Sequence, residues 1–130
     1  MSSDDNWVVD LAIRKARSGE LSPDTLLWTI SACQLCVPTP DPEYAGDLAQ
    51  FVPLLIDRDG TRFLACFTDP AKMGRFSTVA PQFIFLLGAD LMKMMPPDFG
   101  LVVNPETEVW FELPWKGLAL FVNRLNNPDM

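Results

Sequence analysis

The chain has 130 residues, 48% of them hydrophobic and 21% charged, and a net charge of -7 at neutral pH. This length and hydrophobic share suit one compact domain with a real core rather than an intrinsically disordered chain. The acidic balance argues against a nucleic-acid-binding protein, because phosphate contacts need a clustered basic surface. No segment reaches the roughly 20 apolar residues of a membrane helix, and the polar start lacks a secretion signal. We therefore expect a cytoplasmic protein that binds neither nucleic acid nor membrane.

The first predicted elements are two helices and a short strand. After a flexible start at residues 1–5, apolar residues at helical spacing predict a helix that ends before Gly19. Ser22 followed by proline is typical of a helix cap and first turn, so a second helix is expected up to about Ala32. The residues from Gln34 to Val37 favour a short strand.

The middle of the chain is predicted to be a loop followed by a hairpin. Three prolines cannot donate backbone hydrogen bonds, so residues 38–49 are expected to form an irregular loop. Two apolar runs, residues 51–56 and 62–67, flank a turn in which Gly60 can adopt a positive φ. Because neither face of this pair is clearly polar, we expect a central hairpin that is at least partly covered on both sides.

The second half should contain short helices and three strands before a final helix. In chain order the pattern predicts a helix from Asp69-Pro70 to about Phe76, a strand at Gln82–Leu87, a helix ending at Pro96-Pro97, a strand at Phe99–Val103, a turn at Asn104-Pro105, and a strand at Glu108–Leu113. A last helix begins at Pro114, and its apolar stripe should pack on the sheet or on a partner. Strict βαβ alternation is absent, so we predict a single α+β domain over residues 1–130, with a mixed or antiparallel sheet flanked by helices.

The residues that could support chemistry are few. The chain has no histidine, which removes the usual general base near neutral pH. Cys33 and Cys36 match a CxxC pair, but they follow a predicted helix, whose C-terminal dipole end would raise the thiol pKa. With Cys66 and one carboxylate they would also make an unusual zinc site. Buried, reduced thiols are the simpler interpretation, and a redox protein is a less favoured alternative.

The acidic residues have similarly plain interpretations. Residues 57–60 faintly resemble a calcium loop but lack its later ligands, so a hairpin turn is expected. Glu106, Glu108, Glu112 and Asp98 could supply paired carboxylates, yet strand alternation places Glu108 and Glu112 on one face and favours a solvated sheet rim. We therefore predict no catalytic residue, no cofactor and no metal.

Two longer stretches resemble a known family. They read FVPLLIDRDGTRFLACFTDPAKMGRF and DLMKMMPPDFGLVVNPETEVWFELP, and their most specific parts are Phe67-Thr68 and the series Pro97, Gly100-Leu101, Asn104-Pro105. Over roughly Leu11 to Leu125 the chain resembles the N-terminal domain of the SseB family, named for enhanced serine sensitivity in bacteria. The resemblance implies a small bacterial cytoplasmic α+β domain of poorly defined role, without established active-site residues. Longer family members add a C-terminal domain.

Exposed aromatic residues would then carry the function. Met95, Trp110, Trp115 and Phe121 are the residues we expect to contact a partner, because tryptophan is enriched at interface hot spots and methionine adapts to varied surfaces. The leading hypothesis is a non-enzymatic protein-interaction module, whose partner could be another protein or a second copy of the chain. The alternative is a regulatory domain that binds a small molecule in a pocket beneath the loop at residues 38–49.

Overall fold

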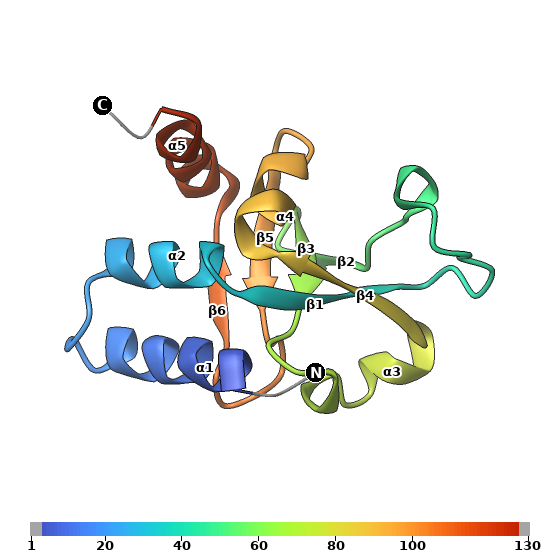
Figure 1. Cartoon of the computed structure of the whole chain (residues 1–130), viewed down its shortest axis with the longest axis horizontal. Helices are drawn as coiled ribbons and strands as arrows, with labels where there is room; N and C mark the ends of the chain where they lie inside the picture. The colour runs from blue at the N-terminus through green and yellow to red at the C-terminus, as the bar shows by residue number, and fades with distance from the viewer. Residues whose placement is uncertain (1–3, 128–130) are drawn as a thin grey trace.

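Helices and strands interleave along the chain in the computed structural model, which describes residues 4–127. The helices are α1 (Asp4–Arg17), α2 (Pro23–Ser31), α3 (Phe76–Val79), α4 (Gly88–Met94) and α5 (Trp115–Asn126), with 3-10 turns η1 (Leu48–Gln50) and η2 (Pro70–Lys72). The strands are β1 (Gln34–Thr39), β2 (Leu55–Arg58), β3 (Thr61–Cys66), β4 (Gln82–Leu87), β5 (Phe99–Val103) and β6 (Phe111–Leu113). Figure 1 shows α1 and α2 side by side at one end of the molecule and the β1–β2 loop projecting at the other.

Two sheets make up the β structure. β1 and β4 form an antiparallel pair, and the other strands form a sheet in the order β2-β3-β5-β6. In this larger sheet β3 and β5 run parallel, whereas the two outer pairs are antiparallel. An isolated antiparallel bridge between Cys36 and Phe67 connects the two sheets. The predicted α+β class with a mixed sheet is confirmed.

Apolar clusters lie on both faces of β3. Leu64 and Cys66 enter the larger cluster, to which α1, α2, α4 and α5 also contribute buried side chains. Phe63 and Ala65 point the other way, into a smaller cluster that contains Phe76 of α3. This arrangement follows from the alternation of side chains along a strand. β3 is therefore buried on both faces, as the sequence predicts for the hairpin.

The hairpin as a whole is less central than predicted. β3 is an inner strand, but β2 lies at the sheet edge and is largely exposed. The turn consists of Asp59 and Gly60, both with positive φ (51° and 84°), as a two-residue hairpin turn requires. Residues 51–54 precede β2 instead of belonging to it.

Two other predicted boundaries were wrong, at Pro38 and after Asp69. Pro38 lies within β1, which tolerates it because its position opposite Phe83 turns its backbone away from β4, and its C=O accepts from Leu54 N–H at 3.0 Å. The predicted helix after Asp69 is divided into η2 and α3, because Gly74 between them adopts a φ of 54°. Of the predicted flexible start, residues 1–3 lie outside the described part of the chain, whereas Asp4 and Asp5 belong to α1.

The strand predicted at residues 108–113 is limited to β6, because the preceding turn satisfies its own backbone. Asn104 Nδ2 donates to the Val109 C=O at 2.9 Å, and the Val109 N–H donates to Thr107 Oγ1 at 3.1 Å. These two groups would otherwise be free to extend the ladder with β5.

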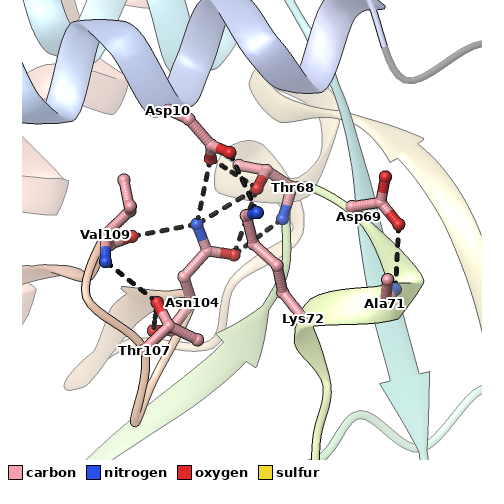
Figure 2. Close-up of polar contacts among 8 residues, drawn as sticks. All are labelled: Asp10, Thr68, Asp69, Ala71, Lys72, Asn104, Thr107 and Val109. Atoms are coloured by element: carbon pink, nitrogen blue, oxygen red, sulfur yellow. Dashed lines mark hydrogen bonds and ion pairs between the residues drawn. The ribbon is translucent and has the colours of Figure 1, made fainter.

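Asn104 is the centre of a buried polar network that joins three segments (Figure 2). Its Oδ1 accepts from the Thr68 N–H at 2.9 Å, and its Nδ2 also donates to Thr68 Oγ1 at 3.1 Å. Thr68 Oγ1 donates to Asp10 Oδ1 of α1 at 2.7 Å, and Lys72 of η2 pairs with the other Asp10 oxygen at 3.1 Å. The network therefore fixes α1, the segment after β3 and the β5–β6 turn relative to one another.

Replacing Asn104 with alanine should be strongly destabilising. Alanine would leave the buried Thr68 N–H and Val109 C=O without partners and would have to adopt the φ of 55° that Asn104 tolerates. We expect a loss of about 3 kcal/mol in the free energy of unfolding, measured by urea denaturation. The exposed Asn123→Ala on α5 is the matched control and should change it by less than about 0.5 kcal/mol. Equal effects of the two substitutions would contradict this role for Asn104.

Gly100 of β5 should likewise not accept a side chain. A Cβ at this position would lie 2.6 Å from two ring carbons of Phe63 and 2.8 Å from the Leu113 carbonyl oxygen. Gly100→Ala should therefore cost about 1–3 kcal/mol in thermal or urea unfolding. Gly117→Ala in α5 is the control, because its Cβ meets only the end of the Leu113 side chain, at 3.1 Å, and alanine favours the helix. A Gly100→Ala protein as stable as the wild type would show that Phe63 can move aside.

Candidate functional site

Trp115, the first residue of α5, stands between two surface grooves. One lies between α5 and the segment that follows α4, has a volume of about 290 Å³ and contains Met95 and Val122 in its lining. Pro96 and Pro97 end α4 here, so the chain crosses in front of α5 instead of continuing as a helix. We call this depression the α4–α5 groove. Its lining is mainly apolar, with Lys93 and Asp98 as its charged members.

The second groove lies on the face of the larger sheet that carries the smaller apolar cluster, which we call the outer sheet face. Strand register places Ile56, Val102 and Glu112 on this face, because each lies beside a residue of the same orientation on the neighbouring strand. A hollow of about 320 Å³ runs from Trp115 to Arg58, and a larger one of about 600 Å³ extends from Arg58 past Val102.

Trp110 borders the larger hollow, and contacts with Arg17 of α1 hold it in this position. The Arg17 guanidinium lies 4.5 Å from the centre of the Trp110 ring and donates a hydrogen bond to the Glu108 C=O at 2.9 Å. The ring is nevertheless 40% exposed, and Trp115 is 37% exposed. The Asn104 network fixes the turn that leads into this segment, so Trp110 is presented from a rigid position.

Two arginines at the hollows are paired with carboxylates. Arg58 forms an ion pair with Glu112, and Arg75 forms hydrogen bonds with both carboxylate oxygens of Glu106. The bonds from Arg75 lower the pKa of the Glu106 carboxyl. The Glu106 carboxylate therefore remains charged and paired near neutral pH, which suits a polar rim better than acid-base catalysis.

The four predicted contact residues lie in three different environments. Met95 and Trp115 both line the α4–α5 groove, and Trp110 lies on the outer sheet face. Phe121 is only 2% exposed and packs against the Trp28 ring at a centroid distance of 4.9 Å, so its prediction as a surface contact was wrong. The helical stripe that contains Phe121 packs on the domain itself, because α5 covers the larger apolar cluster.

Other members of this surface were not found from the sequence. Ile56 and Arg58 belong to the predicted hairpin, but only the parallel pairing of β3 with β5 brings that hairpin beside Val102 and Glu112. Their contribution therefore depends on long-range register. The alternating pattern of Arg58 and Ile56 was the available signal, and it did not indicate which strands would be neighbours.

The three cysteines do not form an activated pair. Cys36 is fully buried in the smaller cluster, whereas Cys33 is half-buried and packs against the larger one. Burial, with a smaller contribution from Asp69, raises the pKa of the Cys36 thiol to about 12. Burial also raises the pKa of Cys66. The raised pKa values of Cys36 and Cys66 oppose the thiolate that exchange chemistry needs.

The remaining expectations concern metals, membranes and a pocket. Within the described residues, no three Cys, Asp or Glu side chains converge so that they could hold a metal ion. None of the helices in that part of the chain is long and apolar enough to cross a membrane. The grooves described above draw no lining residue from residues 38–49, and a further hollow of about 210 Å³ reaches only Phe51 and Pro53 near that loop.

Comparison with known proteins identifies a family. The model of the SseB protein N-terminal domain matches residues 9–119, which is most of the chain. No curated protein and no solved structure gives a significant match. The matched range includes the hairpin, the Asn104 turn, Trp110 and Trp115, but not the last turns of α5. The chain therefore belongs to the SseB family and contains its N-terminal domain.

Proposed function

We propose that this domain is a protein-interaction module that binds another protein through the surface containing Met95, Trp115 and Trp110. The observation that carries the proposal is the pair of tryptophans, 37% and 40% exposed, at the borders of surface grooves. Tryptophans that border desolvated pockets dominate the energy of many protein interfaces. Burying these rings and the groove walls would provide the favourable free energy of binding.

The chemistry of the surface supports binding over catalysis. Arg58 and Arg75 at the hollows are paired with the carboxylates Glu112 and Glu106, an arrangement typical of the polar rim of an interface. The paired charges also leave the rim close to neutral, which favours a partner with an apolar patch over a highly charged one. Such an interface should depend only weakly on salt concentration.

Rigidity is a second supporting feature. Arg17 stacks on Trp110, and Trp115 begins a helix whose buried stripe is fixed in the core. Side chains that are already ordered lose less conformational entropy when a partner binds. This surface therefore meets the requirement of a pre-organised contact site.

The test is the capture of partner proteins from a lysate of the source organism by the immobilised domain. Trp115→Ala and Trp110→Ala should each lower the affinity for the specific partner by at least about tenfold, because hot-spot truncations cost about 2 kcal/mol or more. Leu120→Ala is the control: this residue of α5 is 71% exposed and does not line the grooves described above. Circular dichroism should show that all three variants fold. If both tryptophan variants retain every partner that the wild type captures, this surface is not the binding site.

Thiol alkylation tests the redox alternative separately. At pH 8 we expect iodoacetamide to modify Cys33 in the folded protein, whereas Cys36 and Cys66 should react only after denaturation. A pKa near 12 makes the thiolate fraction of Cys36 about a thousandfold smaller than that of an ordinary cysteine. Mass mapping of the labelled peptides measures the order of reaction. Rapid labelling of folded Cys36 would restore the redox hypothesis.

A further inference from the structure

β4 forms an open sheet edge that differs in character from the edges formed by β2 and β6. Within the described residues its only strand neighbour is β1, and α4 is the other element that packs closely on it (Figure 1). The edge strand β2 carries Asp57 and Arg58, and β6 has only three residues. Charge and shortness are common protections of sheet edges. β4, reading QFIFLL, has six residues and no charge.

The backbone of β4 offers its free groups in a regular pattern. Cys36 uses both its N–H and its C=O on Phe67, each at 2.8 Å, so its partner across the ladder, Phe85, forms no hydrogen bond to it. Pro38, opposite Phe83, has no N–H and directs its C=O to Leu54. By the alternation of an antiparallel ladder, Phe83 and Phe85 direct their N–H and C=O groups away from β1.

The side chains of these residues form an exposed apolar pair. Phe83 and Phe85 are 38% and 39% exposed, and their rings meet edge to face with centroids 5.6 Å apart. The residues between and after them, Ile84 and Leu86, point the other way and pack against the larger cluster. The outward face of β4 thus combines free backbone groups with two aromatic rings.

We propose that β4 pairs with β4 of a second copy of this chain, antiparallel about a two-fold axis at Ile84. In this register Phe83 lies opposite Phe85 of the other copy, and the outward groups of both residues form four hydrogen bonds across the seam. The four rings then lie together on one face of a continuous sheet, where aromatic pairs add stability.

The ends of β4 fit the same register. Pro81 comes to lie opposite Leu87 of the other copy, so its C=O can accept from the Leu87 N–H. Pro81 has no N–H to donate, and the Leu87 C=O needs none, because Leu87 is the N-cap of α4 and its C=O accepts the first bond of that helix. A shift of two residues in either direction would instead leave a Phe83 N–H or a Phe85 C=O without a partner.

The lack of charged side chains near β4 also permits a second copy to approach this edge. Each molecule carries a net charge of -7, so two copies repel at long range, but residues 76–89 contain no charged side chain that would oppose contact at the seam. Salt should therefore strengthen the association by screening the repulsion. The strand shares no residue with the α4–α5 groove or the outer sheet face, so pairing leaves the Trp110 and Trp115 surface free.

The first test measures mass and its dependence on charge. In sedimentation equilibrium up to about 1 mM protein, the wild type should approach the dimer mass, and more so at higher salt. Phe85→Lys should weaken association at least about tenfold, because a charged edge residue opposes strand pairing. Leu120→Lys makes the same change in net charge on exposed α5 and should associate like the wild type. Circular dichroism checks the fold of both variants.

The second test reads the register in the wild-type protein. Amide hydrogen exchange of Phe83, Phe85 and Leu87 should slow as the concentration rises, whereas Ile84 and Leu86, whose amides bond to β1, should already be protected at low concentration. A monomer at all concentrations overturns the proposal, as does a dimer that Phe85→Lys leaves intact. Concentration-dependent protection that falls on α5 or β2 while these amides do not change overturns it as well.

Discussion

The carboxamide of Asn104 holds together the parts of the chain that the backbone ladders leave separate. It forms hydrogen bonds with the Thr68 N–H and the Val109 C=O, both in a buried region. It also donates to the Thr68 hydroxyl, which in turn donates to Asp10 of α1. A buried polar group without a partner costs more than a typical hydrogen bond contributes, so this connection is expensive to break. The first helix, the segment after β3 and the β5–β6 turn consequently adopt one relative position.

The proposed binding surface depends on that position. β6 begins only after the Asn104 turn has ended, and this places Trp110 where Arg17 of α1 can stack on it. The parallel pairing of β3 and β5 then brings Ile56 and Val102 onto one face beside it. The surface is therefore built by tertiary connections among distant segments, and no single element contains it.

The two surfaces proposed here use different physical interactions. The Trp110 and Trp115 surface would bind through apolar side chains above paired charges, whereas the β4 edge would bind through backbone hydrogen bonds in a fixed register. Since they share no residue, a dimer could display two copies of the tryptophan surface. Two linked copies would bind a repeated or dimeric partner more tightly than one copy does, through effective concentration.

The sequence by itself determined most of the elements. The cap at Ser22, the strands Gln82–Leu87 and Phe99–Val103, the helix end before Pro96, and the final helix all follow from local propensity and turn chemistry, and the structure confirms them. The family was also readable from the residues of the hairpin and of the Asn104 turn, and the family match confirms it. These features depend on neighbours in the chain, so a local pattern can specify them.

Tertiary structure alone decided what is buried and what is exposed. Phe121 and Trp115 lie in one helix and were predicted alike, yet the packing of α5 against Trp28 buries the first and leaves the second at the surface. Pro38 could join a strand because its missing N–H faces no acceptor on β4. The strand at residues 108–113 was shortened by a side-chain bond from Asn104. Each outcome depends on which distant segment lies alongside, and the period of a local sequence pattern carries no information about that.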